Sequence, residues 1–338
     1  MYYDSNTDYI KMKKIAFLLL LATAGAYAQT EVKFAAKIQN RNSDSLLVRS
    51  RSFKKVLKAD KTGAFKDAFA VETGFYQLFD GTENTTVFLK NGFDLNLAMD
   101  AKMFDESIVY KGKGEKENNY LAKKALETEL LVEKLGKIED IAQQKVLIDA
   151  FIANSEQQLK DPSLDVTFAT ALTKEIEADR KDLTAMGEDA AKALKMLGKP
   201  SPLFTYENFK GGTTSLNDLK GKYVYIDVWA TWCGPCRQEI PFLQEVEKKY
   251  HGKKIEFVSI SVDKAKDHEK WKKMVTDKSL GGVQLFADKD WASDFIQAYG
   301  INSIPRFILI GPDGKVVDAD AKRPSDSELQ VQLDSLLK

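Results

Sequence analysis

The chain has 338 residues, and its 50 lysine and arginine residues balance its 50 aspartate and glutamate residues, so the formal net charge is zero. A neutral chain has no overall field that attracts a polyanion, which argues against nucleic acid or an anionic membrane surface as the partner. The length and a hydrophobic share of 43% are sufficient for more than one globular unit. Each unit can bury a core without disulfide cross-links.

Residues 1–28 have the pattern of a secretory signal peptide. Three lysines between Lys11 and Lys14 precede the apolar run Ile15–Ala26, and Ala26-Tyr27-Ala28 offers a small-x-small cleavage site. The run is shorter than the ~20 residues that a bilayer-spanning helix needs, which disfavours the alternative of an uncleaved anchor. The polar, acidic stretch before the lysines is unusual for a signal, so Met12 is an alternative start. We therefore predict export to the periplasm or cell envelope, as a protein that is soluble after signal cleavage and in a compartment where disulfides persist.

Residues 29–112 predict a small antiparallel β domain. Apolar and polar residues alternate in Val32–Ile38, and the same period of two recurs in later short segments, as in strands with one buried face. The strongest local signal is Asn91-Gly92 between Val87–Lys90 and Phe93–Leu97, because Asn-Gly accepts the positive φ angles of a tight hairpin turn. We therefore expect the two flanking strands to pair as a hairpin.

Residues 113–198 predict a helical region. Apolar residues recur at helical spacing from Leu121 to Val146, and lysine and glutamate fill the other face. Pro162 marks a break between helices, and a further helical segment extends from about Asp165 to Leu197. The charged residues are interpreted as a solvated face and not as a binding surface.

Residues 199–338 predict an α/β domain with the element order β, α, β, α, β, β, α. A helix follows Cys233, and another helix, Glu328–Leu337, ends the domain. The expected strands are Tyr223–Val228, Ile255–Val262, Phe307–Ile310 and Lys315–Val317. This alternation predicts a mixed central sheet with helices on both faces.

The only two cysteines of the chain, Cys233 and Cys236, stand two residues apart at the expected start of a helix. The unpaired amides and the positive dipole end of that helix favour a thiolate at Cys233. Pro235 suits the first turn, because the amide that proline lacks would have no partner there. Since the thiolate is the nucleophile in disulfide exchange, we expect Cys233 to attack first and the less exposed Cys236 second.

A zinc site and a purely structural disulfide are the alternatives for this pair. Zinc would need two further ligands, and the two histidines, His251 and His268, are not spaced as a pair on one turn. A bridge over so short a loop would stabilise the fold little, because the entropy that it removes grows with loop length. We therefore predict a redox-active disulfide, with no metal and no other cofactor.

The stretch Asp227–Cys236 resembles the active-site strand and turn of thioredoxin. Pro241 matches the proline inside the following helix of that fold, Ser303-Ile304-Pro305 resembles its cis-proline turn, and Arg306–Gly314 resembles its terminal hairpin. Cys236–Pro241 is most similar to exported, membrane-associated or periplasmic thioredoxins of the TlpA and ResA type. The resemblance covers about residues 200–338, and it extends more weakly to the N-terminal β and helical region, which resembles that of Bacteroidetes proteins in this group.

The resemblance implies two acids that act with the catalytic cysteines. Asp227 lies in an apolar strand, where desolvation raises the pKa of a carboxyl group, so it could accept the proton of Cys236. Glu239 matches the acid that this subgroup carries one turn after the second cysteine, although a first-turn glutamate favoured by the helix dipole is an alternative interpretation. Ser259 stands where thioredoxin has a lysine, so Asp227 lacks that partner, and which acid handles the proton stays open.

The resemblance also implies a substrate-binding surface. Ile304 would offer its backbone to an extended substrate strand. Pro305 would bring that turn beside Cys233 if its peptide bond is cis, the alternative being an ordinary turn proline. The other residues implied to contact the substrate are Trp232, Gly234 and Pro235.

The sequence therefore predicts an exported thiol-disulfide oxidoreductase, mainly a reductase, because Gly-Pro between the cysteines resembles the reducing members. A disulfide oxidase or isomerase is one alternative, and an envelope protein whose N-terminal region binds a partner is another. Peroxidase activity is a third, although Asp227–Cys233 lacks the Pro-x-x-x-Thr-x-x-Cys pattern of peroxidatic sites. The expected substrates are disulfide-containing envelope proteins. Because the chain has no further cysteine, electrons would come from another protein, which we expect to be a membrane electron donor.

Overall fold

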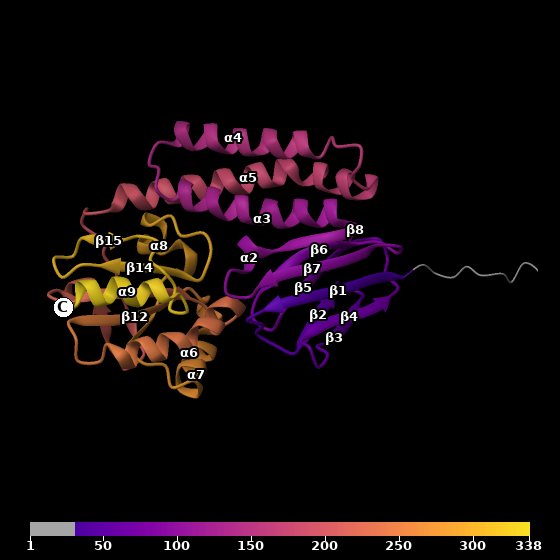
Figure 1. Ribbon diagram of the computed structural model, residues 1–338. Helices are drawn as coiled ribbons and strands as arrows, with labels where there is room; N and C mark the ends of the chain where they lie inside the picture. The colour runs from indigo at the N-terminus through magenta and orange to yellow at the C-terminus, as the bar shows by residue number, and fades with distance from the viewer. Residues whose placement is uncertain (1–30) are drawn as a thin grey trace, which may run out of the picture. The chain divides into compact units, whose positions relative to one another are not determined.

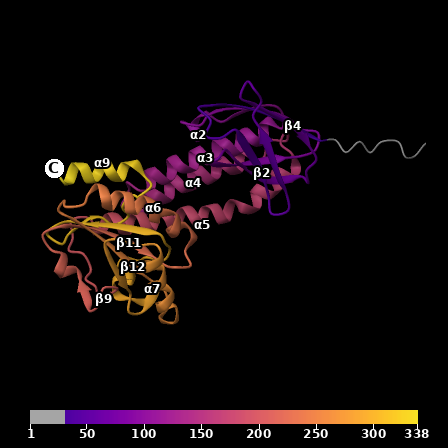
Figure 2. The same cartoon turned by 90° about the horizontal axis from the view of Figure 1, so that it is seen from below.

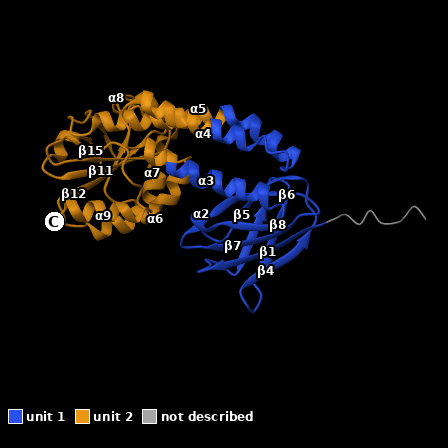
Figure 3. Cartoon of the chain, turned by 45° about the horizontal axis from the view of Figure 1, so that its top comes forward, with its two compact units in different colours: residues 1–130, 153–177 blue, residues 131–152, 178–338 orange. Residues whose placement is uncertain are grey.

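The computed structural model describes residues 31–338 (Figure 1), so the predicted signal peptide lies outside the described residues. The chain divides into two compact units (Figure 3). Of the described residues, the first unit, called here the β-rich unit, contains 31–130 and 153–177, and the second, called the α/β unit, contains 131–152 and 178–338. Across residues 31–338, none of the helices combines the length and the apolar character that a membrane crossing requires.

The β-rich unit contains two four-stranded sheets, with the strand orders β4-β1-β7-β8 and β3-β2-β5-β6. In β1, Val32, Phe34, Ala36 and Ile38 are all buried, as the period of two predicts for a strand with one face on a core. The short helix α2 (Phe104–Ser107) precedes the last strand. The strands are β1 (Val32–Gln39), β2 (Ser45–Arg49), β3 (Lys54–Lys58), β4 (Ala64–Phe69), β5 (Gly74–Phe79), β6 (Asn84–Leu89), β7 (Asp94–Asp100) and β8 (Val109–Lys113).

Two expectations for this region are wrong. A tight turn is present at Asn91-Gly92, since Gly92 has a φ of 88° and the Phe93 amide donates to the Lys90 carbonyl at 3.0 Å. However, β6 and β7 belong to different sheets, so the turn carries the chain from one sheet to the other and closes no hairpin. The region is also not wholly antiparallel, because β1 and β7 pair in parallel. Both errors concern the choice of pairing partner, which local turn chemistry does not decide.

Three long helices follow, α3 (Glu115–Leu135), α4 (Ile141–Gln158) and α5 (Val166–Met196), and Pro162 lies between the last two as predicted. In the β-rich unit, the Phe168 ring of α5 packs on Phe88 of β6, with ring centroids 5.2 Å apart, and on Tyr120 of α3, at 5.7 Å. In the α/β unit, the buried Gln144 side chain of α4 donates to the Gly187 carbonyl of α5 at 2.8 Å. Phe168, Tyr120 and Gln144 therefore interrupt the charged faces of the three helices because each of them contacts a neighbouring element of its own unit.

A seven-stranded mixed sheet forms the centre of the α/β unit, in the order β10-β9-β13-β12-β11-β14-β15 (Figure 1). β12 pairs in parallel with β11 and β13, whereas β11 and β14 are antiparallel. The strands are β9 (Thr205–Asn208), β10 (Thr213–Ser215), β11 (Tyr223–Trp229), β12 (Ile255–Ser261), β13 (Val283–Phe286), β14 (Arg306–Ile310) and β15 (Val316–Asp318). Strands β9, β10 and β13 were not predicted from the sequence, because they are three or four residues long and too short to show a period.

Helices cover both faces of this sheet, as predicted (Figure 2). Alternate residues of β11 point to opposite faces: Val224 belongs to one core cluster with Trp271 of α7 and Phe295 of α8, and Tyr225 to another with Leu329 of α9. Helix α6 lies on the α9 face, because its Leu243 belongs to the Tyr225 cluster. The helices are α6 (Gly234–Lys249), α7 (His268–Asp277), α8 (Asp294–Ala298) and α9 (Ser327–Leu336), with 3-10 turns at Leu216–Leu219, Ala265–Asp267 and Asp290–Ala292.

Candidate active site

Cys233 and Cys236 form a disulfide at the start of α6, with their Cα atoms 5.3 Å apart. Cys233 is the N-cap residue, and its sulfur accepts a hydrogen bond from the Cys236 amide at 3.1 Å. Gly234 and Pro235 begin the helix, and Pro241 lies inside it. A helix N-terminus of this kind stabilises a negatively charged sulfur. In the disulfide state the two cysteines are almost equally buried, at 4% and 3% exposure.

A buried hydrogen-bond network that was not predicted from the sequence fixes the turn before the cysteines. The carboxylate of Asp263, which is fully buried, accepts hydrogen bonds from the Thr231 amide and from the Thr231 hydroxyl, both at 2.8 Å. The Ser261 hydroxyl donates to the same carboxylate at 2.8 Å. Asp263 lies two residues after the end of β12, so the network connects the end of this strand to the turn that follows the neighbouring strand β11. A carboxylate shortly after a buried strand is the sequence signal that could have indicated it.

The turn of Ile304 and Pro305 lies beside the disulfide. The peptide bond between these residues is cis, and the Ile304 carbonyl oxygen is 3.8 Å from the Cys233 sulfur. The structure thus brings together two segments that are about seventy residues apart in the chain. A backbone turn beside a reactive sulfur can pair with an extended peptide.

Asp227 of β11 is buried on the side of the sheet that α6 covers. Burial raises the pKa of its carboxyl group to about 8, and the negative charges of Glu239 and then Glu247 add to this shift. Within residues 31–338, Asp227 Oδ1 has no hydrogen-bond partner. Ser259 stands opposite Asp227 in the register of β11 and β12. Asp227 is therefore a buried acid whose pKa is close to neutral pH, the property of a group that can both accept and donate a proton.

Glu239 lies in the second turn of α6, since no acidic residue is present in the first turn. The alternative interpretation of Glu239 as a first-turn glutamate is therefore wrong. Its side chain is buried, and both of its carboxylate oxygens accept hydrogen bonds from Ser325: the amide donates to Oε2 and the hydroxyl to Oε1, each at 2.9 Å. The Arg323 guanidinium is 3.8 Å from Oε1. Ser325 and Arg323 precede α9, and no sequence motif had connected them with the cysteines.

Two tryptophans lie close together beside the cysteine turn. Trp232 is 52% exposed although it directly precedes Cys233, and its ring centroid is 6.5 Å from that of Trp291. The Trp291 turn is held locally, because the Gln297 side chain donates to the Trp291 carbonyl at 2.7 Å. An exposed tryptophan next to a reactive sulfur provides apolar area for a substrate chain.

The two histidines lie away from this turn. His268 contacts the Glu207 carboxylate at 3.0 Å, whereas His251 follows the far end of α6. Within residues 31–338, histidine, cysteine, aspartate and glutamate side chains form no group of three or more that could hold a metal ion.

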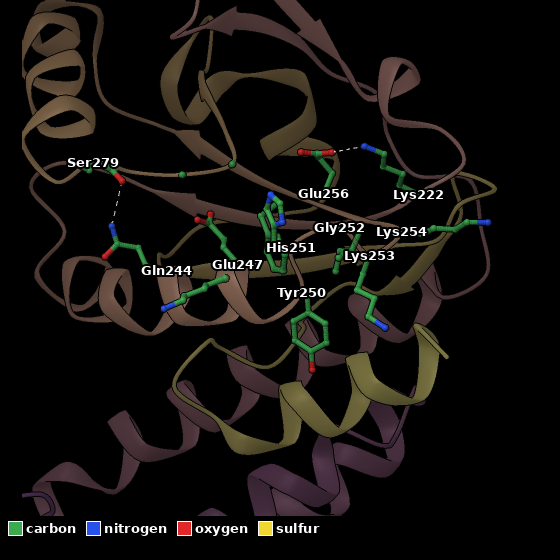
Figure 4. A pocket seen from close by; sticks show the side chains of 15 residues that line it. Lys222, Gln244, Glu247, Tyr250, His251, Gly252, Lys253, Lys254, Glu256 and Ser279 are labelled. Carbon is green, nitrogen blue, oxygen red and sulfur yellow. Dashed lines mark hydrogen bonds and ion pairs between the residues drawn. The ribbon is translucent and has the colours of Figure 1, made fainter.

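A hollow of about 830 Å³ lies at the far end of α6 and is lined by neither cysteine (Figure 4). Glu247 projects into it from α6, beside His251. Burial raises the pKa of Glu247 to about 7. A Cβ on Gly281 would approach Glu247 Oε2 to 2.2 Å, so this glycine leaves the room that the carboxylate occupies. Glu247 is relevant to the active site through its charge, which acts on Asp227.

Comparison with known proteins gives matches that include this site. The AhpC/TSA family model matches residues 197–319, a range that contains both cysteines and the Ile304-Pro305 turn. The thiol-disulfide oxidoreductase ResA of Bacillus anthracis is 33% identical over 129 residues, which cover 38% of this chain and 72% of that protein. ResA of Bacillus subtilis (strain 168) is 33% identical over 122 residues, which cover 36% of this chain and 64% of that protein.

Solved structures that are similar to this chain include two from Bacteroides species. The thioredoxin domain of a thiol-disulfide oxidoreductase from Bacteroides vulgatus is 31% identical, and the match covers 42% of this chain and 98% of that domain, with a TM-score of 0.39. A thiol-disulfide oxidoreductase from Bacteroides fragilis is 27% identical over 41% of this chain and 100% of its own, with a TM-score of 0.37.

Proposed function

This chain belongs to the thioredoxin-like thiol-disulfide oxidoreductases related to ResA, and on that basis we propose that it is exported and reduces disulfides of cell-envelope proteins. The observation that carries the proposal is the Cys233–Cys236 disulfide at the start of α6, beside the Ile304 carbonyl. A bond between two residues of one helical turn can open and close without unfolding the domain around it. The cysteine pair itself carries the electrons in this proposal, without a further cofactor.

The reaction consists of two thiol-disulfide exchanges. The Cys233 thiolate attacks one sulfur of the substrate disulfide, so that a mixed disulfide forms and the other substrate sulfur leaves as a thiolate. The Cys236 thiolate then attacks the Cys233 sulfur, which re-forms the Cys233–Cys236 disulfide and releases the second substrate thiolate. Two electrons pass from the enzyme to the substrate in each cycle. A separate electron donor, which we propose to be a membrane protein, must reduce the enzyme again.

We assign the proton transfer of Cys236 to Asp227. Cys236 must lose its proton before it can attack the mixed disulfide. Asp227 is free to take this proton, because its Oδ1 has no hydrogen-bond partner within residues 31–338 and its pKa of about 8 is close to neutral pH. Glu239 is the other candidate, but Ser325 already occupies both of its oxygens.

We propose that the substrate binds as an extended chain along the Ile304 backbone. Pro305 in the cis form places the Ile304 carbonyl near the Cys233 sulfur, and Trp232 offers exposed apolar surface on the neighbouring turn. Gly234 and Pro235 lie between the cysteines and carry no long side chain that would crowd a substrate chain at this turn. This surface suits a polypeptide substrate better than a small thiol.

Trapping of the mixed disulfide tests the proposal. A Cys236→Ser variant of the full-length chain should accumulate mixed disulfides between Cys233 and envelope proteins. A matched Cys233→Ser variant should trap none. Non-reducing gels and mass spectrometry would identify the trapped partners. Trapping by neither variant, together with a wild-type enzyme that fails to reduce insulin, would exclude the proposed function.

The reduction potential tests the reductive direction. A reductase should have a potential nearer to about −270 mV, as in thioredoxin, than to about −120 mV, as in the oxidant DsbA. A potential at the oxidising end would favour the oxidase or isomerase alternative. Because the AhpC/TSA model matches the chain, consumption of hydrogen peroxide should be measured with the same preparation, and efficient turnover would favour a peroxidase.

A further inference from the structure

We propose that Ser325 is a positioning residue that fixes the Glu239 carboxylate near Asp227, so that Glu239 acts as a stationary negative charge and not as the proton acceptor. This inference rests on the proposed role of Asp227 in proton transfer. It assigns distinct tasks to the two acids and adds a residue from the C-terminal segment to the site.

The contacts between Ser325 and Glu239 carry the inference. The Ser325 amide and hydroxyl each donate to a different oxygen of the carboxylate, both at 2.9 Å. Arg323 adds a positive charge at 3.8 Å from Oε1. A buried carboxylate with a hydrogen bond to each oxygen is held in one orientation. Both Glu239 oxygens thus already accept a hydrogen bond from Ser325.

The segment that carries Ser325 is itself anchored on the sheet. The Tyr225 hydroxyl donates to the Lys322 carbonyl at 2.7 Å, and the Ala321 amide donates to the Phe307 carbonyl at 2.9 Å. On the other side, Asp326 caps α9 by accepting from the Glu328 amide at 2.9 Å. Tyr225 is two residues before Asp227 in β11 and points to the same face of the sheet. The strand that carries Asp227 thus also anchors the segment that holds Glu239.

Several ionisable groups surround this pair of acids. Burial raises the pKa of Tyr225 well above its ordinary value, and the charges of Asp227 and Glu239 add to this shift. The groups that act on Asp227 or on its neighbour Tyr225 are Glu239 and Glu247 of α6, Asp318 of β15 and Arg323 of the segment before α9. Glu239 is the strongest of the charges that act on Asp227. Fixing its position therefore fixes the largest charge contribution to the proton affinity of Asp227.

The expected effect of releasing Glu239 follows from its charge. Without the Ser325 hydroxyl, Oε1 would lose its donor and only the amide bond to Oε2 would remain. The less constrained carboxylate would turn toward solvent, because hydration and repulsion by ionised Asp227 both favour that movement. Water screens the interaction between charges much more strongly than the protein interior does. Asp227 would then lose its proton at a lower pH than in the wild-type protein.

Titration of Asp227 in the full chain tests this expectation. NMR of isotope-labelled aspartate carboxyl carbons can follow Asp227 directly, with its signal assigned by its loss in Asp227→Asn. Ser325→Ala should lower the midpoint by about half a pH unit and Glu239→Gln by about one. Ser325→Thr, which keeps the hydroxyl and the amide, should restore the wild-type midpoint. Ser335→Ala is the matched control, since the Ser335 hydroxyl donates to the Gln332 carbonyl within α9 and does not contact Glu239.

A double variant separates positioning from a general structural role. In a Glu239→Gln background, Ser325→Ala should cause no further shift, because the charge that Ser325 positions is already absent. The inference would be overturned if Ser325→Ala left the Asp227 midpoint unchanged. It would also be overturned if Ser325→Ala shifted that midpoint as much in the Glu239→Gln background as in the wild-type protein. Insulin reduction by the wild-type enzyme tests the proposed function separately, since the midpoint of Asp227 can be measured whether or not the enzyme is active.

Discussion

Two aspartates, one in each unit, show how differently the molecule treats a buried carboxyl group. Asp165 of the β-rich unit has a side chain that is only 9% exposed, and it pairs with Lys90 at 2.6 Å and accepts from the Thr167 amide at 2.8 Å. Burial alone would raise the pKa of Asp165, but these hydrogen bonds outweigh burial and lower it. Asp227 of the α/β unit has an oxygen with no partner within residues 31–338, and its pKa is raised.

The difference separates a structural acid from one that is available for chemistry. Hydrogen bonds and a counter-charge stabilise Asp165 in its ionised form, so its charge contributes to stability. Asp227 is buried without such compensation, which costs stability and leaves its proton exchangeable near neutral pH. The two acids should therefore have opposite effects on stability as the pH changes.

The largest expected effect is that of Asp227→Asn. The unfolded chain ionises Asp227 above about pH 4, whereas the folded chain retains the proton up to about pH 8. The wild-type protein thus loses stability as the pH rises between these values. Asp227→Asn should be more stable than wild type by about 3–5 kcal/mol at pH 9 and nearly equal to it at pH 3. Its insulin reduction should fall by about 10²-fold at neutral pH.

Urea unfolding of the oxidised proteins at several pH values measures the stability difference. A difference that stays constant from pH 3 to pH 9 would show that Asp227 is not the titrating group and would remove the contrast with Asp165.

The next largest effect is expected at Asn118 in the β-rich unit. This side chain is fully buried, accepts from the Phe88 amide at 2.9 Å and donates to the Phe88 carbonyl at 2.9 Å. Asn118→Ala leaves both Phe88 groups without these partners, so it should lower the free energy of unfolding by about 2–4 kcal/mol. Circular dichroism during denaturation measures this loss, and insulin reduction by the folded variant should be unchanged.

Asn96→Ala is the matched control, because Asn96 is exposed on β7, and it should change stability by less than about 0.5 kcal/mol. If both variants lost the same free energy of unfolding, the buried hydrogen bonds of Asn118 would not be the cause of the loss.

A smaller effect of opposite pH dependence is expected for Asp165→Asn. Because the pKa of Asp165 is lowered in the folded state, its contribution is present at neutral pH and is lost as the pH falls through the folded pKa. The variant should be less stable than wild type by about 1 kcal/mol at pH 7, and the difference should close at low pH. Thermal unfolding at pH 7 and at pH 3 would measure this. A stability difference between variant and wild type that grows as the pH falls would contradict the lowered pKa of Asp165.

The smallest effect is expected for Glu247→Gln at the far end of α6. The charge of Glu247 is the weakest of the three contributions to the raised pKa of Asp227. Its removal should move the midpoint of Asp227 to lower pH by less than Glu239→Gln does, as followed by NMR of the aspartate carboxyl carbons. Glu245→Gln, an exposed neighbour on the same helix, should leave the midpoint unchanged. A larger shift for Glu247→Gln than for Glu239→Gln would reverse the order of the two charges.

Much of the α/β unit follows from local sequence features. The apolar run Tyr223–Val228 lies within a central strand, and Cys233 is the N-cap of α6. A continuous apolar segment has to be buried on both faces, and a proline in a first helical turn loses no hydrogen bond. These constraints act within a few residues, so the position of the cysteine pair and the order of the main elements could be predicted.

Pairing between distant segments could not be predicted in this way. The Asn91-Gly92 turn forms, but the strands on its two sides join different sheets, because packing of the whole strand set decides the partner. The same holds for the Asp263 carboxylate at Thr231 and for Ser325 at Glu239. Each of these contacts joins residues more than thirty positions apart.

The sequence by itself determined the chemistry available at the site: two thiols at a helix start, an acid in an apolar strand and a proline turn that resembles that of thioredoxin. Only the tertiary structure decided how the two acids differ. Both carboxylate oxygens of Glu239 accept hydrogen bonds from Ser325, whereas Asp227 has an oxygen without a hydrogen-bond partner within residues 31–338. The proton affinity of a buried carboxyl depends on its desolvation and on the charges and donors around it, and these arise from segments that only folding brings together.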